Sequence, residues 1–389
     1  MRHFRHVTEA DERRLFSVLP EEFDRSAASP TLAAALGATL YMPATRPAIA
    51  KDLHKQGAAG VMSVVVCLED AIADAELASA QANVVAQLRS LPCDGKDTDN
   101  LPLTFIRVRH PRQIPELVGS LGDHAAILSG FVLPKFTGST GPAYLEALYE
   151  ARHESGLPLL MMPVIESPEV VHRETRVDTL MDIRQLLDDH RDLVLAIRLG
   201  ATDLSAAYGL RRDRDLTIYD VRIIAEVIAD VVNILGRADG TGHVVTGPVW
   251  EYFPSQGRIF KPLLRQTPFD EQEARALRKE LMVRDLDGLI REVVLDKANG
   301  LTGKTVIHPT HVAAVHALSV VTHEEHLDAC EILGRGTMGG GAHASSYGNK
   351  MNETKPHRSW AERTVRRSRA FGVAAEDVTF VDLLAAAIA

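Results

Sequence analysis

The chain has 389 residues, of which 46% are hydrophobic and 24% are charged, and its formal net charge is −9 at pH 7. This composition is typical of a globular protein with enough apolar material for one large domain and an appendage, or for two ordinary domains. The acidic balance argues against nucleic acid as a main partner. It leaves a small anionic substrate open, because a few arginines or a metal ion can reverse the potential inside a cleft.

The cysteines and the apolar segments indicate a cytoplasmic protein. Cys67, Cys93 and Cys330 are scattered and show no spacing of paired metal ligands, which fits a reducing compartment. The first ten residues lack the apolar core of a signal peptide. No apolar run is long enough to span a membrane, so we expect no membrane partner.

The first expected elements are helices within residues 1–36, which are polar at first and then rich in alanine. Residues 37–43 then predict a short strand that ends at a proline. Residues 61–68 form a continuous β-branched run, which predicts a strand covered on both faces. Six further strands are expected on the same grounds, at 103–108, 130–133, 159–165, 193–199, 243–246 and 305–307.

Helical segments such as 71–91 and 219–235 alternate with these strands, and nearly every strand ends in a polar residue. A doubly wound open sheet would concentrate its polar ends at one switch point, whereas a closed barrel distributes them. We therefore predict an α/β fold with a TIM (β/α)8 barrel over residues 37–333. An N-terminal helical extension over 1–36 and a glycine hinge with a helical tail over 334–389 would flank it.

Two of the expected strands end in an acidic residue beside proline, glycine, serine or threonine. Glu166 ends the run 162–168, and Asp203 ends the run 196–204. Each acid alone could be a helix N-cap. Carboxylates from successive strands of a parallel barrel would instead lie at one end, where they could bind a single divalent cation together with water. Oxygen ligands without cysteine or histidine favour Mg²⁺, with Mn²⁺ possible, over zinc.

Seven motifs occur in the order and spacing of one known family. They are Tyr41-Met42-Pro43, Cys67-Leu68-Glu69-Asp70, Arg107, Pro134-Lys135, Ile165-Glu166, Gly200 to Asp203, and Ile307-His308-Pro309. Over roughly residues 38–330 the chain resembles the citrate lyase β-subunit and the related aldolase and malyl-CoA lyase enzymes. The resemblance implies a Mg²⁺-dependent carbon–carbon bond lyase on a TIM barrel. The tail over 346–360 resembles more closely a branch encoded beside bacterial tellurite-resistance and stress genes.

The resemblance also implies roles for individual residues. Glu166 and Asp203 would be the metal ligands, and Glu69 and Asp70 would orient metal-bound water. Arg107 would hold a substrate carboxylate, or the carbonyl that becomes an enolate. From the residues alone, Arg107 could equally form a salt bridge with Glu69 or Asp70, and the two contacts are compatible.

Two positions depart from the family pattern. Cys67 stands where the family usually has Asp, and Arg109 lies near the position where it usually has Asn. Both changes make the cleft less acidic, which favours a substrate with more negative charge than a simple keto acid.

Four further residues are candidates for substrate binding. Arg46 and Lys135 could hold a second anionic group, and Gly200 lies in the turn before Asp203. His308 could contact a substrate oxygen, or it could be a hydrogen-bonded structural histidine.

The roles of Arg198 and of the arginines in the tail helix remain open. Arg198 lies inside an expected strand, where a pair with Glu166 or Asp182 is as plausible as a ligand contact. The tail helix carries Arg363, Arg366, Arg367 and Arg369. Its arginines could form a solvated face or bind the phosphate of a nucleotide or of CoA.

The tail also contains a candidate acid. Residues 349–353 resemble a Gly-Lys-Met-Ile-Asp-like motif whose acid closes over the active site of a neighbouring subunit. The resemblance places Glu353 at this position, as a proton-transfer group acting in trans within a homo-oligomer such as a trimer or hexamer. Alternatively, Glu353 caps a helix or pairs near Lys355 on the surface. The glycines of 334–341 would provide a hinge.

The expected function is thus cleavage or condensation of a small oxo- or hydroxy-acid, or of its CoA thioester, through a metal-stabilised enolate. A malate-synthase-like condensation with thioester hydrolysis is an alternative. A barrel that only binds a metabolite, or that holds together a stress-response complex, is the non-catalytic alternative.

Overall fold

The computed structural model describes residues 1–92, 101–253, 286–336 and 341–388. Cys93 lies outside these ranges, as do the central residues of the glycine cluster. Eight strands form one sheet in the order β7-β6-β5-β4-β3-β2-β9-β8. They are β2 (Ala38–Pro43), β3 (Ser63–Cys67), β4 (Leu103–Arg107), β5 (Leu128–Leu133), β6 (Leu160–Ile165), β7 (Arg198–Leu199), β8 (Gly247–Trp250) and β9 (Lys304–Val306).

Neighbouring strands are parallel, and hydrogen bonds beside the two outermost strands close the sheet. The Ile197 N–H donates to the Val244 carbonyl at 2.8 Å, and the Thr246 N–H donates to the Ile197 carbonyl at 2.9 Å. A closed parallel sheet has no exposed edge. The predicted TIM barrel is confirmed.

One strand prediction was wrong in position. The strand expected at 243–246 lies instead at Gly247–Trp250, and Val245 only bridges Ile197. Gly247 and Pro248 resemble a turn in sequence, because proline cannot donate to a strand ladder. The pairing between β8 and β9 shifts register between Gly247 and Trp250, which accommodates the proline.

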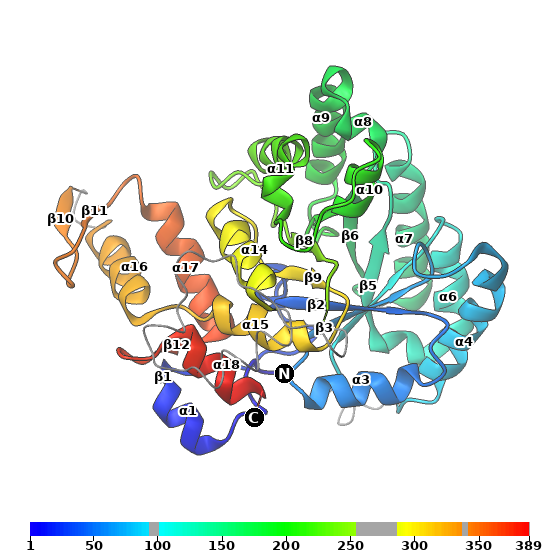
Figure 1. Cartoon of the computed structure of the whole chain (residues 1–389). Coiled ribbons are helices and arrows are strands. Elements are labelled where there is room, and N and C mark those ends of the chain that lie inside the picture. Colours follow the sequence, from blue (N-terminus) through cyan, green and yellow to red (C-terminus); the bar gives the residue numbers. More distant parts are fainter. Residues whose placement is uncertain (93–100, 254–285, 337–340, 389) are drawn as a thin grey trace.

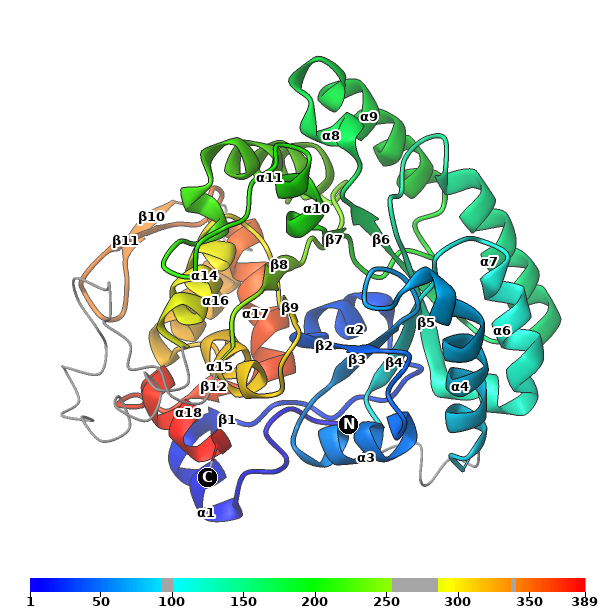
Figure 2. The same ribbon diagram turned by 45° about the vertical axis from the view of Figure 1, so that its right-hand side comes forward.

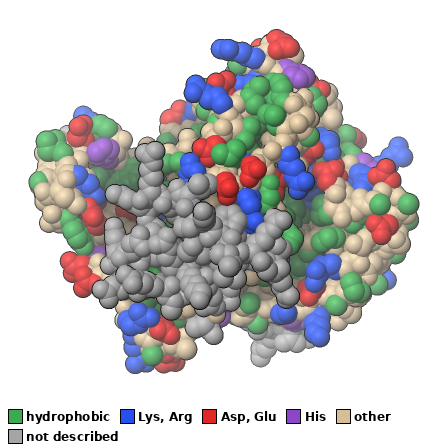
Figure 3. All heavy atoms as spheres, viewed as in Figure 1, with side chains coloured by type: hydrophobic (Ala, Val, Ile, Leu, Met, Phe, Trp, Pro, Cys, Tyr) green, Lys and Arg blue, Asp and Glu red, His purple; other side chains and the backbone are tan. Residues whose placement is uncertain are grey.

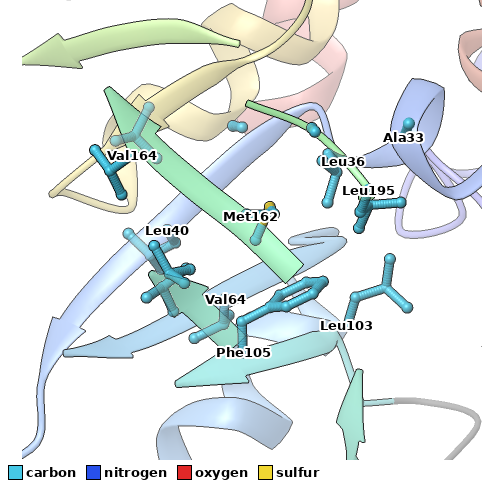
Figure 4. Close-up of a cluster of buried hydrophobic side chains, with 14 of the residues drawn as sticks. Ala33, Leu36, Leu40, Val64, Leu103, Phe105, Met162, Val164 and Leu195 are labelled. Carbon is cyan, nitrogen blue, oxygen red and sulfur yellow. The ribbon is translucent and has the colours of Figure 1, made fainter. Parts of the chain in front are cut away.

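Helices surround the barrel, as Figures 1 and 2 show from two directions. The long ones are α3 (Ile49–Ala58), α4 (Leu77–Arg89), α6 (Gln113–Leu121), α7 (Gly141–Ser155), α9 (Arg173–Asp189), α11 (Arg222–Leu235), α14 (Leu286–Ala298) and α15 (Thr310–Ser319). Strands β3 and β6 are buried along their whole length because helices cover their outer face. Figure 4 shows part of the core, where Leu40, Val64, Phe105 and Met162 lie in one cluster.

The two ends of the chain pack together beside the barrel. Strand β1 (Phe16–Val18) pairs antiparallel with β12 (Val373–Ala374). Helix α2 (Ser29–Ala35) contacts α17 (Arg358–Phe371), and α18 (Phe380–Ile388) contacts both α15 and the N-terminal helix α1 (Glu9–Leu15). The N-terminal extension and the C-terminal tail therefore support each other.

A hairpin projects from this end of the molecule. It consists of β10 (Ala342–Ala344) and β11 (Met351–Glu353), and it follows α16 (His323–Gly336), which packs on α17. In Figure 1 the hairpin lies at the far left, well away from strands β3 to β6. Within the described ranges no helix is long and apolar enough to cross a membrane.

A buried ion network joins β9 to α14 and to the loop after α10 (Ala201–Ala206). The Lys304 Nζ lies 2.9 Å from Glu292 Oε1 and 2.7 Å from Asp296 Oδ2, and all three side chains are almost inaccessible to solvent. Arg212 also pairs with Glu292. Charges removed from water this completely require partners, and breaking such a pair costs far more than breaking a surface pair.

We therefore expect Lys304→Met to lower the free energy of unfolding by about 3–5 kcal/mol, because it leaves Asp296 without its cation. Arg222→Met is the matched control, since the Arg222–Glu226 pair is largely exposed and should contribute at most about 1 kcal/mol. Urea unfolding of the two variants measures the difference. Equal losses would contradict a stabilising role for the buried network.

Candidate active site

The expected polar residues do meet at one end of the barrel. Glu69 and Asp70 follow β3, Arg107 ends β4, Lys135 follows β5 and Glu166 follows β6. The C-terminal ends of parallel strands lie at the same edge, so residues far apart in sequence become neighbours there.

Arg107 is the centre of this group. Its Nη2 atom lies 2.7 Å from Glu69 Oε2, 3.1 Å from Asp70 Oδ2 and 2.9 Å from Glu166 Oε1. The salt bridge to Glu69 or Asp70 expected from the sequence is thus present, and Glu166 joins it. The contact with each of the three acids is made by the same nitrogen, Nη2.

Lys135 is the second cation of the group. Its Nζ lies 2.5 Å from Glu69 Oε1 and 3.7 Å from Asp70 Oδ1. Its backbone φ of +48° is unusual for a residue with a side chain. In this conformation the Lys135 N–H donates to Glu166 Oε1 at 3.0 Å. Both ends of Lys135 therefore bind acids of the cluster.

Only one of the two carboxylate oxygens of Glu166 accepts hydrogen bonds from described residues. Oε1 accepts from Arg107 and from the Lys135 N–H, whereas the buried Oε2 has no hydrogen-bond partner among the described residues. Gly200 packs directly against this atom, since a Cβ there would lie 2.2 Å from Oε2. Buried polar atoms are rarely left unpaired, so an orphan oxygen of this kind indicates a ligand position.

The carboxyl groups differ in acidity. Burial raises the pKa of Glu166 to about 7, and the charge of Asp203 adds to the shift against the opposing charge of Arg107. Burial and the hydrogen bond to Glu69 raise the pKa of Asp70 to about 6. Although burial opposes it, the hydrogen bonds and charges from Asp70, Arg107 and Lys135 hold the pKa of Glu69 at about 2.

Asp203 completes the acidic group from the first turn of α10, which follows β7. It is half-buried, and its charge raises the pKa of both Asp70 and Glu166, so it lies within electrostatic range of both. With Glu69 there are four carboxylates against two cations. The fully ionised cluster carries a formal charge of −2, but within the described ranges no three of its acids lie close enough together to hold a metal ion.

The other candidates lie outside this cluster. Arg46 pairs with Asp52 of α3 at 2.6 Å and is half exposed. The His308 Nδ1 lies 2.8 Å from the Thr310 hydroxyl oxygen, and its ring stacks on Phe253 with centroids 5.1 Å apart. Burial lowers the pKa of His308. These contacts match the structural alternative for His308.

Glu353 lies on the projecting hairpin and is exposed. Its N–H donates to the His357 Nδ1 at 3.0 Å. Lys350 and Asn352 hold the hairpin to α16 through the buried Asp328, at 2.7 Å each. One chain therefore does not bring Glu353 to its own carboxylate cluster.

Arg198 has an environment that the sequence did not indicate. It is almost fully buried inside the barrel, and its acceptors are the neutral Thr39 Oγ1 at 3.2 Å and Thr305 Oγ1 at 2.5 Å. The guanidinium lies 5.4 Å from the centre of the Tyr41 ring. No described carboxylate lies within salt-bridge distance, so the suggested pairs with Glu166 and Asp182 are absent. Lys304, Arg176 and Arg212, the other buried cations of the described ranges, all have acidic partners.

Comparison with known proteins bears on the identity of this site. The sequence pattern of the family described as C–C bond lyase of the TIM-barrel fold matches residues 30–373, which is most of the chain. The chain belongs to this family. It is therefore a lyase, and the carboxylate cluster lies where a TIM-barrel enzyme has its active site. No curated protein is similar enough to match.

Solved structures agree with the fold. A citrate lyase from Burkholderia xenovorans is 16% identical, with 91% of this chain and 96% of that chain covered and a TM-score of 0.60. The protein CitE from Mycobacterium tuberculosis, solved with magnesium, acetoacetate and coenzyme A, is 21% identical. The match covers 86% of this chain and 99% of that chain, with a TM-score of 0.52. At these identities the likeness concerns the fold.

The acidity of Glu166 makes a prediction for stability. A folded-state pKa raised from 4.5 to about 7 means that the folded chain binds this proton more tightly than the unfolded chain. In metal-free buffer the free energy of unfolding should therefore fall as pH rises through this interval, at roughly 1.4 kcal/mol per pKa unit.

Glu166→Gln should remove this loss, because glutamine keeps an acceptor for Arg107 without the charge. At pH 8 we expect the variant to be more stable than the original chain by about 1–3 kcal/mol, and at pH 4 nearly equal. Urea unfolding with EDTA measures both. The control is Glu169→Gln at an exposed position. Its free energy of unfolding should stay within about 0.5 kcal/mol of that of the original chain at either pH. A Glu166→Gln variant less stable at pH 8 would contradict this account of the site.

Proposed function

We propose that this lyase uses Mg²⁺, with Mn²⁺ as a substitute, to cleave or form a carbon–carbon bond in a small oxo- or hydroxy-acid or its CoA thioester. The unpartnered Oε2 of Glu166 is the observation that carries the proposal. It is buried, it faces Gly200, and Asp203 lies within electrostatic range. Two carboxylates in a cluster of net negative charge are a donor set that suits a hard divalent ion.

In this proposal Glu166 and Asp203 bind the ion directly, and Glu69 and Asp70 hydrogen-bond the water around it. When bound, the ion supplies Lewis-acid stabilisation of the negative charge that develops on a substrate oxygen. Arg107 fixes the orientation of Glu166 through Nη2, and its Nη1 is available for a substrate carboxylate. Lys135 holds Glu69 in place and adds positive charge for an anionic substrate.

Glu353 is the proposed proton-transfer group, acting on the site of a neighbouring subunit in a homo-oligomer. The support is its position on an exposed hairpin that projects away from its own barrel.

Because the tail resembles that of the branch found beside tellurite-resistance and stress genes, we also place the chain in this branch, as a cytoplasmic enzyme. Figure 3 shows acidic and basic side chains interspersed over one face, typical of a protein that faces water.

The direct test is release of a keto acid from candidate hydroxy-acids and their CoA thioesters, with and without Mg²⁺. Activity that depends on Mg²⁺ and is abolished by Glu166→Gln or Asp203→Asn supports the proposal. Thioester hydrolysis coupled to condensation would support the malate-synthase-like alternative. Metabolite binding without turnover would support the non-catalytic one.

Gly200→Ala should weaken Mg²⁺ binding at least tenfold, because its Cβ would displace the Glu166 carboxylate. Gly119→Ala is the matched control, since a Cβ at that exposed position of α6 meets nothing within 4 Å. Isothermal titration of the two folded variants with Mg²⁺ makes the comparison. Unchanged affinity in Gly200→Ala would remove Glu166 Oε2 from the proposed metal site.

Arg107→Lys keeps one positive charge but loses the planar fork, so it cannot contact the acids through Nη2 and the substrate through Nη1 together. We expect kcat/KM to fall at least 100-fold while the chain stays folded. Arg222→Lys, which alters an exposed pair on α11, should change kcat/KM less than twofold. Similar losses in both variants would contradict the proposed role of Arg107.

The role of Glu353 predicts complementation between subunits. Glu166→Gln and Glu353→Gln subunits should each be inactive, and mixed oligomers should regain part of the activity because some sites receive an intact acid from each partner. Subunit exchange is verified by native mass spectrometry of tagged chains. Exchange without recovered activity would rule out catalysis by Glu353 in trans.

A further inference from the structure

Helix α17 carries five arginines, and they divide into two kinds. Arg358 lies 3.0 Å from Glu362, Arg367 lies 2.6 Å from Glu325, and Arg369 lies 3.7 Å from Glu21. Arg363 and Arg366 have no acidic partner among the described residues. Glu362 lies next to Arg363 in sequence, yet its carboxylate pairs with Arg358.

The two unpaired arginines line a cleft of about 310 Å³ between α17 and the barrel. Arg237 and His243 face it from the segment that leads into β8, and Gly300 and Thr302 face it from the turn that leads into β9. Arg367 and Glu362 also lie at its border, each engaged in the pair described above. The cleft therefore has more positive than negative charge.

Local contacts hold the arginines in place. The Arg363 Nη2 donates to the Gly236 carbonyl at 3.0 Å, which fixes its guanidinium over the end of α11. Gly300 has a φ of +85°, and a Cβ there would lie 4.0 Å from Arg363 Nη1. The Arg237 Nε donates to the Asn233 carbonyl at 2.8 Å. Arg363 and Arg237 thus each have one nitrogen anchored to the backbone.

Electrostatics make this arrangement unfavourable without an anion. Burial and the neighbouring charge of Arg366 both lower the pKa of Arg363. Like charges held close together destabilise a surface, and no described carboxylate lies within salt-bridge distance of Arg363 or Arg366, although Glu362 borders the cleft. A bound anion would remove the repulsion.

The cleft is separate from the carboxylate cluster. Its barrel residues precede β8 and β9, so they lie at the N-terminal ends of the strands, whereas Glu166 and Arg107 lie at the C-terminal ends. A ligand here would not compete with the substrate. It would bridge the tail helix to the barrel.

We propose that this cleft is a second binding site, which takes a small phosphate-bearing ligand between Arg237, Arg363 and Arg366. Guanidinium groups match phosphate oxygens with paired N–H donors, and several of them converge here around a multiply charged anion. The volume suits a phosphate or pyrophosphate group with a small organic part. Since the ligand contacts both α17 and the barrel, its binding stabilises the attachment of the C-terminal segment.

Inorganic pyrophosphate is the probe, tested on the full chain carrying Glu166→Gln, in EDTA and at constant ionic strength. These conditions exclude binding through a metal at the carboxylate cluster, so the result does not depend on the proposed lyase chemistry. Isothermal titration should show one site, and the melting temperature should rise with pyrophosphate concentration. Sodium acetate at equal ionic strength should produce neither effect.

Arg366→Gln and Arg363→Gln, each added to this background, should weaken pyrophosphate binding at least tenfold. Arg366 is exposed and makes no backbone hydrogen bond with a described residue, so its loss should not disturb folding even if the loss of Arg363 does. Arg358→Gln and Arg369→Gln, on the same helix, are matched controls and should stay within twofold. Absence of binding at millimolar pyrophosphate, or equal losses in the controls, would overturn the proposal.

Discussion

The contact of Arg107 with three carboxylates is the constraint on which the site depends. Glu69, Asp70 and Glu166 come from two different strand ends, and without a shared cation their repulsion would drive the acids apart or protonate them. The arginine uses one nitrogen for all three acids. One oxygen of Glu166, the buried Oε2 beside Gly200, is left without a hydrogen-bond partner among the described residues. The same interaction thus organises both the proposed metal position and the proposed substrate position.

Elsewhere in the barrel, buried cations have two kinds of surroundings, with and without an acidic partner. Lys304 and Arg212 lie against acids of α14, so that network is neutralised within the protein. Arg198 has hydroxyl, thioether and aromatic neighbours and no described carboxylate within salt-bridge distance. Its charge lowers the pKa of the Tyr41 phenol, although burial raises that pKa overall.

Much of the barrel could be predicted from the sequence, because continuous apolar runs such as 61–68 and 159–165 are diagnostic of strands covered on both faces. The polar residues after such runs also predicted that Glu69, Arg107 and Glu166 would lie together. The geometry within the cluster could not be predicted, since no pattern shows that Lys135 adopts φ +48° or that Thr39 and Thr305 both reach Arg198. Residues from strands far apart in sequence meet only through the closure of the barrel.

Anomalous diffraction from crystals soaked with Mn²⁺ and oxalate tests the central claim most directly. The account predicts one manganese peak between Glu166 Oε2 and Asp203, with oxygen ligands at roughly 2.1–2.2 Å and one oxalate oxygen facing Arg107 Nη1. A peak at another place in the barrel would contradict the account. So would oxalate bound at the cluster without manganese.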